Sequence, residues 1–342
     1  MNRFNFYSII VPSFNRSEEI TELIHSISKL NFPNSRFELI IADDGSTDNT
    51  KAIIENYIEK ADIKLSFYTQ KNMGPGAARN LGMEKATGDF FIFVDSDCMV
   101  DFNWLEAIDN KLTKFEADAF GGPDSYTDDF PSLLKAINYS MTSFFTTGGI
   151  RGHRKKKLGK FYPRSFNMGL SREVYLTIGG FGQLRHGQDI EYSNRIINSG
   201  AKVISIEDAI VYHKRRTSLR RFFKQVFNWG VARVNLYKID SSLLEPVHFL
   251  PAVATILSIL VLVLSILYWA VFKYVLLFGF LILVISGVDA AVKYKDCKMI
   301  IFVPLFIPTQ TFGYGLGFLL AFFWRIILKK DELVGFRKKY YS

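Results

Sequence analysis

Two hydrophobic patterns alternate along the first 120 residues. Four short segments are apolar on both faces, as strands are in a parallel sheet that helices cover. They occupy residues 7–12, 37–43, 63–69 and 89–95. Between them, apolar residues recur at helical spacing in residues 18–30, 49–61 and 76–86. The pattern predicts a β-α-β-α-β-α-β order, which belongs to the α/β class with a mostly parallel central sheet.

A different pattern begins at Phe249, where long apolar runs appear. Residues 249–271 and 274–288 approach the about 20 apolar residues that a helix needs to cross a bilayer. A third run, 299–324, is longer but is interrupted by two prolines and several glycines. We therefore expect C-terminal transmembrane helices after a globular domain.

These changes divide the chain into four parts. We expect a globular domain at 1–230, an amphipathic interfacial linker at 231–248, a membrane domain at 249–328 and a basic tail at 329–342. Three complete crossings would leave the tail outside the cell, against the positive-inside rule. A re-entrant hairpin in the third apolar run would return the tail to the cytosol, and we favour that arrangement.

The N-terminus has only a very short apolar run and lacks the pattern of a signal peptide. We therefore expect a multi-pass protein of the cell (inner) membrane whose globular domain is cytoplasmic. The two cysteines, Cys98 and Cys297, lie far apart in the sequence. They indicate neither a disulfide framework nor a zinc site, which fits a reducing compartment.

Basic residues give the 342-residue chain a net charge of +9. They cluster at 151–160, at 213–224 and near the C-terminus, and the sequence contains no nucleic-acid-binding motif. Basic clusters beside apolar helices more often face anionic lipid headgroups. We expect a membrane surface or phosphate groups as partners, and no nucleic acid.

Polar, glycine-rich or acidic loops follow all four predicted strands. They occupy residues 12–18, 43–50, 70–80 and 95–97. Ligands of open α/β sheets bind beyond the carboxyl ends of the strands. These loops therefore form the predicted binding edge.

The first two loops offer groups suited to a nucleobase. Asp44 could accept a hydrogen bond from an imide N–H such as that of uracil, and Phe14 could lie against the face of a base. Ordinary alternatives remain open. Asp43 and Asp44 also suit a turn that leads into a helix, and a lone aromatic side chain is more often part of the packing.

The third loop, GPGAARNLG at 74–82, permits close backbone approach and places Arg79 at the start of a helix, where it could pair with phosphate. It is not a P-loop, because no Gly-Lys-Ser/Thr follows. It also lacks the G-x-G-x-x-G spacing of a dinucleotide loop, which disfavours an oxidoreductase. A plain helix start with Arg79 solvated or ion-paired is the alternative.

Two aspartates, Asp95 and Asp97, follow the fourth predicted strand. Residues i and i+2 of an extended segment point the same way, so both carboxylates could face one point. Hard carboxylate oxygens suit Mg²⁺ or Mn²⁺, which nucleotide sites hold with one or two carboxylates and substrate phosphates. A solvated acidic turn is the alternative.

In combination, these segments resemble family 2 glycosyltransferases of the GT-A fold, a Rossmann-like fold that binds nucleotide sugars. The resemblance covers about residues 6–230 and rests on PSFNR (12–16), ADDGSTD (42–48), GPGAARNLG (74–82), VDSD (94–97), NMGLSREVYLTIGGF (167–181) and HGQDIEYSNRI (186–196). It implies an inverting transferase of the kind that builds bacterial polysaccharides and lipid-linked glycans.

The resemblance also implies roles for single residues. Asp189 would be the catalytic base, Asp97 a metal ligand, and Asp95 a ligand of the metal or the nucleoside. The residues implied to bind the donor nucleotide are Pro12, Phe14, Asn15, Asp44, Arg79 and Asp95.

The chain departs from the family pattern at two places. The family usually has Glu-Asp where this chain has Gln188 and Asp189, which affects positioning rather than the proton acceptor. Processive members carry Gln-x-x-Arg-Trp, whereas here Gln225 and Trp229 lack the arginine between them, which favours addition of a single sugar. Gln188, Gln225 and Trp229 would lie on the acceptor or diphosphate side, and His213 could complete a metal or diphosphate site.

We therefore expect a Mg²⁺- or Mn²⁺-dependent hexosyltransferase that uses a UDP-sugar type of donor and a membrane-associated acceptor. A lipid-linked oligosaccharide is the first choice of acceptor, and a simple lipid is the second. The competing class is a catalytically impaired membrane protein that keeps the fold as a nucleotide-sugar sensor or assembly partner. Gln188 is the only feature that supports this class.

Overall fold

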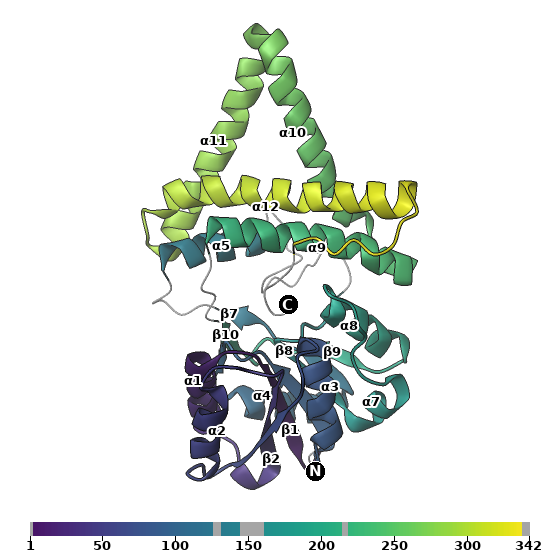
Figure 1. The fold of residues 1–342 in the computed structure, drawn as a ribbon. Coiled ribbons are helices and arrows are strands. Elements are labelled where there is room, and N and C mark those ends of the chain that lie inside the picture. The colour runs from purple at the N-terminus through teal and green to yellow at the C-terminus, as the bar shows by residue number, and fades with distance from the viewer. Residues whose placement is uncertain (1–2, 126–130, 144–160, 214–217, 337–342) are drawn as a thin grey trace. The chain divides into compact units, whose positions relative to one another are not determined.

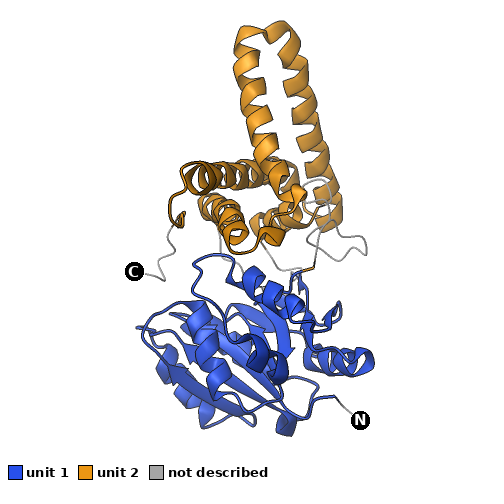
Figure 2. Cartoon of the chain, turned by 90° about the vertical axis from the view of Figure 1, so that its right-hand side faces the viewer, with its two compact units in different colours: residues 1–127, 162–214, 338–342 blue, residues 128–161, 215–337 orange. Residues whose placement is uncertain are grey.

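The chain divides into two units in the computed structural model (Figure 2). One contains Met1–Thr127 and Tyr162–Lys214, and the other contains Asp128–Phe161 and Arg215–Arg337. The structure describes residues 3–125, 131–143, 161–213 and 218–336. The predicted basic cluster at 151–160, part of the cluster at 213–224 and the end of the basic tail lie outside these ranges.

A seven-stranded sheet forms the centre of the first unit, in the order β3-β2-β1-β4-β8-β6-β9. Neighbouring strands are parallel except at β8, which is antiparallel to both β4 and β6. The strands are β1 (Tyr7–Ser13), β2 (Phe37–Asp43), β3 (Lys64–Thr69), β4 (Phe90–Val94), β6 (Ala119–Gly121), β8 (Asn167–Ser171) and β9 (Val203–Ser205). The four strands predicted from the sequence are confirmed to within one residue at each end.

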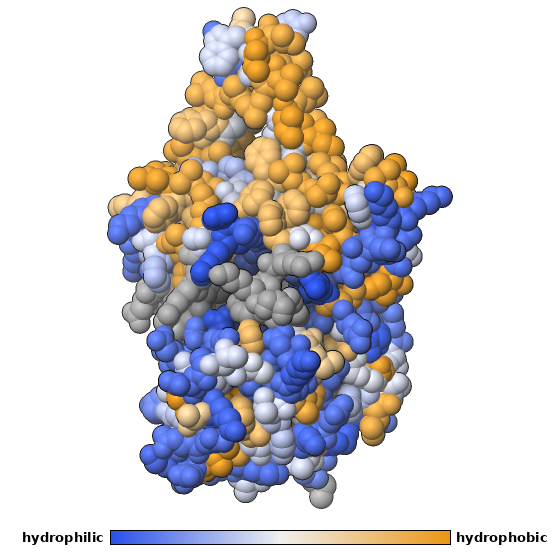
Figure 3. Space-filling model, viewed as in Figure 1, coloured by the Kyte–Doolittle hydropathy of each residue, from blue (hydrophilic) through white to orange (hydrophobic). Residues whose placement is uncertain are grey.

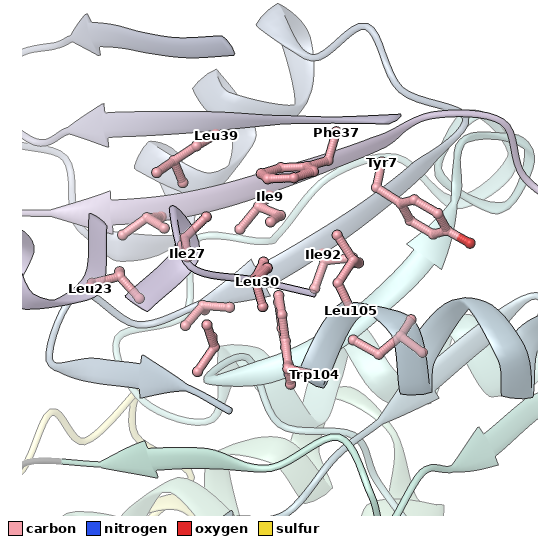
Figure 4. Packing of buried hydrophobic residues seen from close by; sticks show 14 of the residues in the cluster. Tyr7, Ile9, Leu23, Ile27, Leu30, Phe37, Leu39, Ile92, Trp104 and Leu105 are labelled. Carbon is pink, nitrogen blue, oxygen red and sulfur yellow. The ribbon is translucent and has the colours of Figure 1, made fainter. Parts of the chain in front are cut away.

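Helices cover both faces of this sheet (Figure 1). They are α1 (Ser17–Ile27), α2 (Thr50–Ile58), α3 (Pro75–Lys85), α4 (Trp104–Phe115), α7 (Arg172–Ile178) and α8 (Gln188–Asn198). Successive side chains of a strand point to opposite faces. Ile9 accordingly packs in one core with residues of α1, α2 and α4, while Ile10 packs in the other with residues of α3, α7 and α8. Figure 4 shows the first core, where Trp104 lies against the sheet.

A second, three-stranded sheet lies in the same unit. It contains β5 (Cys98–Val100), β7 (Asp124–Ser125) and β10 (Val211–His213), in the order β5-β10-β7. β10 runs antiparallel to β5 and parallel to β7. The segment directly after the DSD motif therefore leaves the main sheet and pairs with a strand more than a hundred residues away.

The second unit is helical. It contains α5 (Ser132–Thr142), α9 (Leu219–Ile239), α10 (Leu250–Leu267), α11 (Trp269–Tyr294) and α12 (Met299–Phe322). The expected domain boundary at residue 230 falls inside α9. Short 3-10 turns at Ser241–Leu243 and Pro246–Phe249 follow α9, and a π-helical turn at Phe323–Ile327 ends α12. α10 and α11 form a hairpin, and α9 and α12 lie side by side, crosswise to it (Figures 1 and 2).

Three helical segments of this unit are long and apolar enough to cross a membrane: Pro246–Leu267, Trp269–Tyr294 and Met299–Ile327. Large apolar side chains point outward along α10 and α11, and hydrophobic residues cover most of the hairpin surface in Figure 3. The three predicted apolar runs are therefore confirmed as helices that could span a membrane.

The expectation of a re-entrant hairpin in the third run is wrong. α12 is one continuous helix that contains both Pro304 and Pro308. A proline removes one helical hydrogen bond but does not reverse the chain. The glycines of this run permit close packing instead: a Cβ on Gly317 would lie 2.1 Å from the carbonyl oxygen of Phe227 on α9.

Candidate active site

The loops after β1 and β2 are tied together by Asn15. Its side-chain oxygen accepts a hydrogen bond from the backbone N–H of Thr47 at 2.8 Å, and its own N–H donates to the hydroxyl of Ser46 at 2.8 Å. Asn15 adopts a positive φ of 51°, a conformation that asparagine tolerates better than most residues. Pro12 is buried in β1, and Phe14 is half-buried at the start of the loop.

Asp43 and Asp44, adjacent at the end of β2, accept hydrogen bonds from different parts of the chain. Asp43 orders its own loop, because it accepts hydrogen bonds from the N–H groups of Gly45 and Ser46 and from the Thr69 hydroxyl. The alternative interpretation of a turn is therefore confirmed for Asp43.

Asp44 connects β2 to the next loop along the sheet. Its carboxylate accepts hydrogen bonds from the N–H of Gly74 at 2.7 Å, the N–H of Met73 at 2.8 Å and the side-chain amide of Gln70 at 2.8 Å. These bonds hold the backbone just before α3. A carboxylate has about four lone-pair sites, so roughly one remains for a ligand.

Arg79 is almost fully buried, and its guanidinium pairs with Asp95 at 2.5 Å. It also lies 5.5 Å from the centre of the Phe181 ring. The ion-paired alternative for Arg79 is therefore confirmed in this structure. The pair links the start of α3 to the end of β4. One oxygen of Asp95 therefore already contacts the Arg79 guanidinium.

The DSD motif does not have the extended geometry that the sequence suggested. The N–H of Cys98 donates to the carbonyl of Asp95 at 3.1 Å, which closes a turn over residues 95–98. The chain must change direction here, because β4 belongs to the main sheet and β5 to the small one. Asp95 and Asp97 are both partly exposed, whereas Ser96 between them is buried.

The backbone of His213 comes close to this motif. β10 pairs His213 with Cys98, the residue that follows Asp97. The His213 side chain lies outside the described part of the structure. Among the residues that are described, no group of three or more His, Cys, Asp and Glu side chains is arranged to hold a metal ion.

Gln188 and Asp189 begin α8, after Gly187, which has a φ of +84°. The amide of Gln188 donates to the carbonyl of Gly182 at 3.1 Å. It also fills the space beside Gly76 of α3, where a Cβ would lie 2.6 Å from the amide nitrogen. The start of α8 therefore packs against the start of α3.

Asn80 of α3 fixes the segment that leads to α8. Its side chain accepts a hydrogen bond from the N–H of Phe181 at 2.7 Å and donates to the Phe181 carbonyl at 3.0 Å. The sequence motifs singled out neither Asn80 nor Arg164, which forms an ion pair with Asp189 at 2.9 Å. Residue spacing carries no sign of contacts that span 25 or 101 positions.

The predicted residues thus fall into two groups. In the first unit, four of them are linked through the start of α3: Asp44 binds the backbone before it, Arg79 pairs with Asp95, and Gln188 packs against Gly76. Gln225 and Trp229 lie on α9, in the second unit.

The sequence matches the model of glycosyl transferase family 2 over residues 8–179, which is about half of the chain. It is 40% identical over 132 residues to the poly(ribitol-phosphate) beta-N-acetylglucosaminyltransferase TarS of Staphylococcus aureus. That match covers 39% of this chain and 21% of TarS, so the chain matches about a fifth of its relative's length.

A longer match is to the dolichyl N-acetyl-alpha-D-glucosaminyl phosphate 3-beta-D-2,3-diacetamido-2,3-dideoxy-beta-D-glucuronosyltransferase of Methanococcus voltae. It has 23% identity and covers 67% of this chain and 73% of that protein. Among solved structures, the mannosyltransferase PcManGT of Pyrobaculum calidifontis, in complex with GDP-Man and Mn²⁺, is similar with a TM-score of 0.61 and 16% identity. The match covers 90% of this chain and 87% of PcManGT. It shows that the fold is of the GT-A type. The family match over half of the chain establishes that the chain belongs to glycosyl transferase family 2.

Proposed function

We propose that the protein transfers a sugar, with inversion, from a nucleotide-diphosphate donor to a membrane-associated acceptor, with Asp189 as the general base. The observation that carries this proposal is the linkage of Asp44, the Arg79–Asp95 pair and the start of α8 through one helix end. Groups suited to a base, a phosphate and a proton acceptor thus belong to one connected edge of the sheet.

In this proposal the acceptor hydroxyl attacks the anomeric carbon of the donor sugar while Asp189 takes its proton. The new glycosidic bond forms as the bond from that carbon to the diphosphate breaks, and the nucleoside diphosphate leaves with the electron pair. A positioned general base typically contributes about 10²–10⁴-fold to such a step.

The donor nucleotide is assigned to the rim of the first two loops. Pro12 and Phe14 would border the base, and Asn15 would keep the two loops together. Asp44 has roughly one acceptor position left for a base N–H, which suits a uracil imide and favours a UDP-sugar. Arg79 would act through Asp95, since the two are already paired.

A divalent cation, Mg²⁺ or Mn²⁺, suits the carboxylates of Asp95 and Asp97. Asp97 and the second oxygen of Asp95 are hard ligands on partly exposed side chains, and substrate phosphates would complete the coordination. His213 is a further candidate from its backbone register beside Cys98. When bound, the cation would neutralise charge on the diphosphate leaving group.

A lipid-linked saccharide is the acceptor that we favour. The name of the Methanococcus voltae relative describes a sugar on a dolichyl phosphate carrier. The apolar α10–α11 hairpin supports a membrane location for this chain as well. A simple lipid is the second choice, and Gln188, Gln225 and Trp229 are assigned to the acceptor or diphosphate side.

We further infer that only α10 and α11 cross the membrane. The 18 residues of α10 span about 27 Å, close to the thickness of the hydrocarbon core. α12 runs crosswise to them, so it cannot cross in the same direction. Two crossings keep α9 and the basic residues after α12 on the cytoplasmic side of the cell membrane, as the positive-inside rule favours.

Single cysteines test this topology. In a Cys297→Ser background, where Cys98 is buried, Tyr268→Cys at the hairpin tip and Asp331→Cys after α12 should react with a membrane-impermeant thiol reagent from opposite sides. Labelling of both from the periplasmic side would establish three crossings instead.

Activity is tested with membranes that contain the protein. A panel of nucleotide sugars is offered with and without Mn²⁺, and sugar transfer to the lipid fraction is measured. One donor should give transfer that depends on the cation and is lost in Asp189→Asn. Absence of transfer and of donor hydrolysis with every nucleotide sugar would favour the binding or assembly class.

A further inference from the structure

We propose that Arg164 is a positioning residue that holds the carboxylate of Asp189 in place for the acceptor hydroxyl. The inference rests on the proposed function, because it assigns to Asp189 the role of the base. Its starting point is the ion pair between an Arg164 guanidinium nitrogen and one Asp189 oxygen at 2.9 Å. The side chains are 27% and 25% exposed, so both are partly shielded from water.

Arg164 lies in a turn that is held to the first unit by a network of buried hydrogen bonds. Its carbonyl accepts a hydrogen bond from the N–H of Asn167, the first residue of β8, at 2.9 Å. Asn167 is fully buried, and its side chain donates to the carbonyls of Ala209 and Pro123 and accepts from the indole N–H of Trp104. Three separate segments therefore fix the residue that anchors the Arg164 turn.

A second tie connects this turn directly to the helix that carries Asp189. The hydroxyl of Ser193, which is fully buried on α8, donates to the carbonyl of Pro163 at 2.6 Å. Ser193 lies one helical turn beyond Asp189. The Pro163–Arg164 segment and α8 are thus joined at two points, which leaves little freedom in the distance between guanidinium and carboxylate.

Two other carboxylates of this region, Glu191 and Asp95, form ion pairs with other arginines. Glu191, on the same helix, pairs with Arg195 at 2.6 Å, and Asp95 pairs with Arg79 at 2.5 Å. Arg164 is therefore matched with Asp189 rather than with either of these carboxylates. The start of α8 also places Asp189 where the helix dipole favours a negative charge.

The ion pair is compatible with the proposed reaction. The Arg164 guanidinium donates one N–H to one oxygen of Asp189, and in this proposal the pair persists while the carboxylate takes the proton of the acceptor hydroxyl. Arg164 neither donates nor accepts that proton, which is why its role is positioning.

The test uses Arg164→Ala and Arg164→Lys in the full-length protein in membranes, with the donor identified by the nucleotide-sugar panel. We expect Arg164→Ala to lower kcat about 10–100-fold, because small misplacements of a reacting group can cost on the order of 10²-fold. The KM for the donor should not change. Arg164→Lys should recover part of kcat, and guanidinium ions should partly rescue Arg164→Ala.

Two comparisons separate positioning from a structural role. Lys111→Ala removes the exposed pair between Lys111 and Asp208 and should leave kcat unchanged. Adding Arg164→Ala to Asp189→Asn should cause no further loss, because a base that is absent cannot be positioned.

Unchanged kcat in Arg164→Ala, a loss confined to donor KM, or an additive loss in the double variant would overturn the inference. If Arg164→Ala does not accumulate, unchanged kcat in Arg164→Lys together with an additive loss on Asp189→Asn would overturn it as well. Near-wild-type transfer by Asp189→Asn alone would instead overturn the proposed function, so the two failures are distinguishable.

Discussion

The first unit and the α10–α11 hairpin of the second unit bury different kinds of side chain. In the first unit, the largest aromatic residues are inside: Tyr7, Phe90 and Trp104 have no exposed surface. In the α10–α11 hairpin, small residues such as Ala252 and Ala290 are inside, while large apolar side chains face outward. Large apolar residues thus point inward in one unit and, along this hairpin, outward in the other.

This difference is the one expected if the hairpin lies in lipid, as proposed above. Burial of large apolar groups stabilises a domain in water, whereas lipid offers no such gain, so helices in a bilayer associate through close contacts between small residues. Hydroxyl groups in the second unit fit the same interpretation. Thr255 donates to the carbonyl of Pro251 and Ser286 to that of Ile282, each within its own helix.

The largest expected effect concerns catalysis by the first unit. Asp189→Asn should lower kcat about 10²–10⁴-fold, because it removes the proton acceptor. Folding, donor binding and membrane attachment should not change, since the second unit is intact. Transfer kinetics measure kcat and the KM for the donor, and membrane flotation measures membrane attachment. Activity close to that of the wild type would remove Asp189 from the mechanism.

The next effect concerns a buried charge in the first unit. Burial alone would raise the pKa of Glu38, but hydrogen bonds from Lys64, Thr87 and Ser8 outweigh it and lower the pKa below its usual 4.5. Glu38→Ala should therefore cost about 3 kcal/mol at neutral pH, because the buried Ser8 hydroxyl loses its acceptor and the ion pair with Lys64 is lost.

A lowered pKa gives this stabilisation a pH dependence of known sign. It is complete above the ordinary pKa of 4.5 and is lost as the pH falls through the folded-state value. The difference between wild type and Glu38→Ala in thermal melting should shrink in acid. A difference that stays constant from neutral pH into acid would show that the charge of Glu38 is not responsible.

Close helix packing in the second unit is tested by a pair of glycines. Gly317→Ala would place a Cβ 2.1 Å from the Phe227 carbonyl oxygen, whereas nothing lies within 4 Å of the corresponding position at Gly279. Overpacking typically costs about 1–3 kcal/mol. Gly317→Ala should lower the Tm in detergent, and Gly279→Ala should not. Equal Tm values would refute the close contact between α9 and α12.

The smallest predicted effect concerns the polar contact between α5 and α11. The Tyr139 hydroxyl donates to Asp289 at 2.6 Å. Burial, followed by the neighbouring Asp289, raises the pKa of Tyr139 to about 12, so it remains a donor at neutral pH. Tyr139→Phe should cost about 1 kcal/mol, compared with no loss for the exposed Tyr237→Phe. A loss of the same size in both variants would argue against the contact.

Much of the first unit could be predicted because its signals are local. The strands at 37–43 and 89–95 contain the apolar runs 39–42 and 90–94, and the loops after them carry Asp44, Asp95 and Asp97. The remaining strands of the unit were not predicted. β6, β9 and β10 have only three residues each, too few for a periodic pattern to appear.

The partners of the site residues were less predictable. Arg79 was expected to face phosphate or solvent or to form an ion pair, and only the structure identifies Asp95 as its partner. The pairing of Arg164 with Asp189 depends on how a turn before β8 meets the start of α8. Such contacts arise from tertiary packing and have no counterpart in residue spacing.

One feature of the chain path limits how the protein can be shortened. α5 lies in sequence between β7 and β8, yet it packs with α11 and α12 in the second unit. A C-terminal truncation before Phe249 would therefore strip α5 and α9 of their apolar partners rather than release a water-soluble enzyme. A water-soluble fragment of the first unit needs two cuts: one that replaces residues 128–161 with a short polar linker and keeps the turn at Arg164, and one that ends the chain before α9.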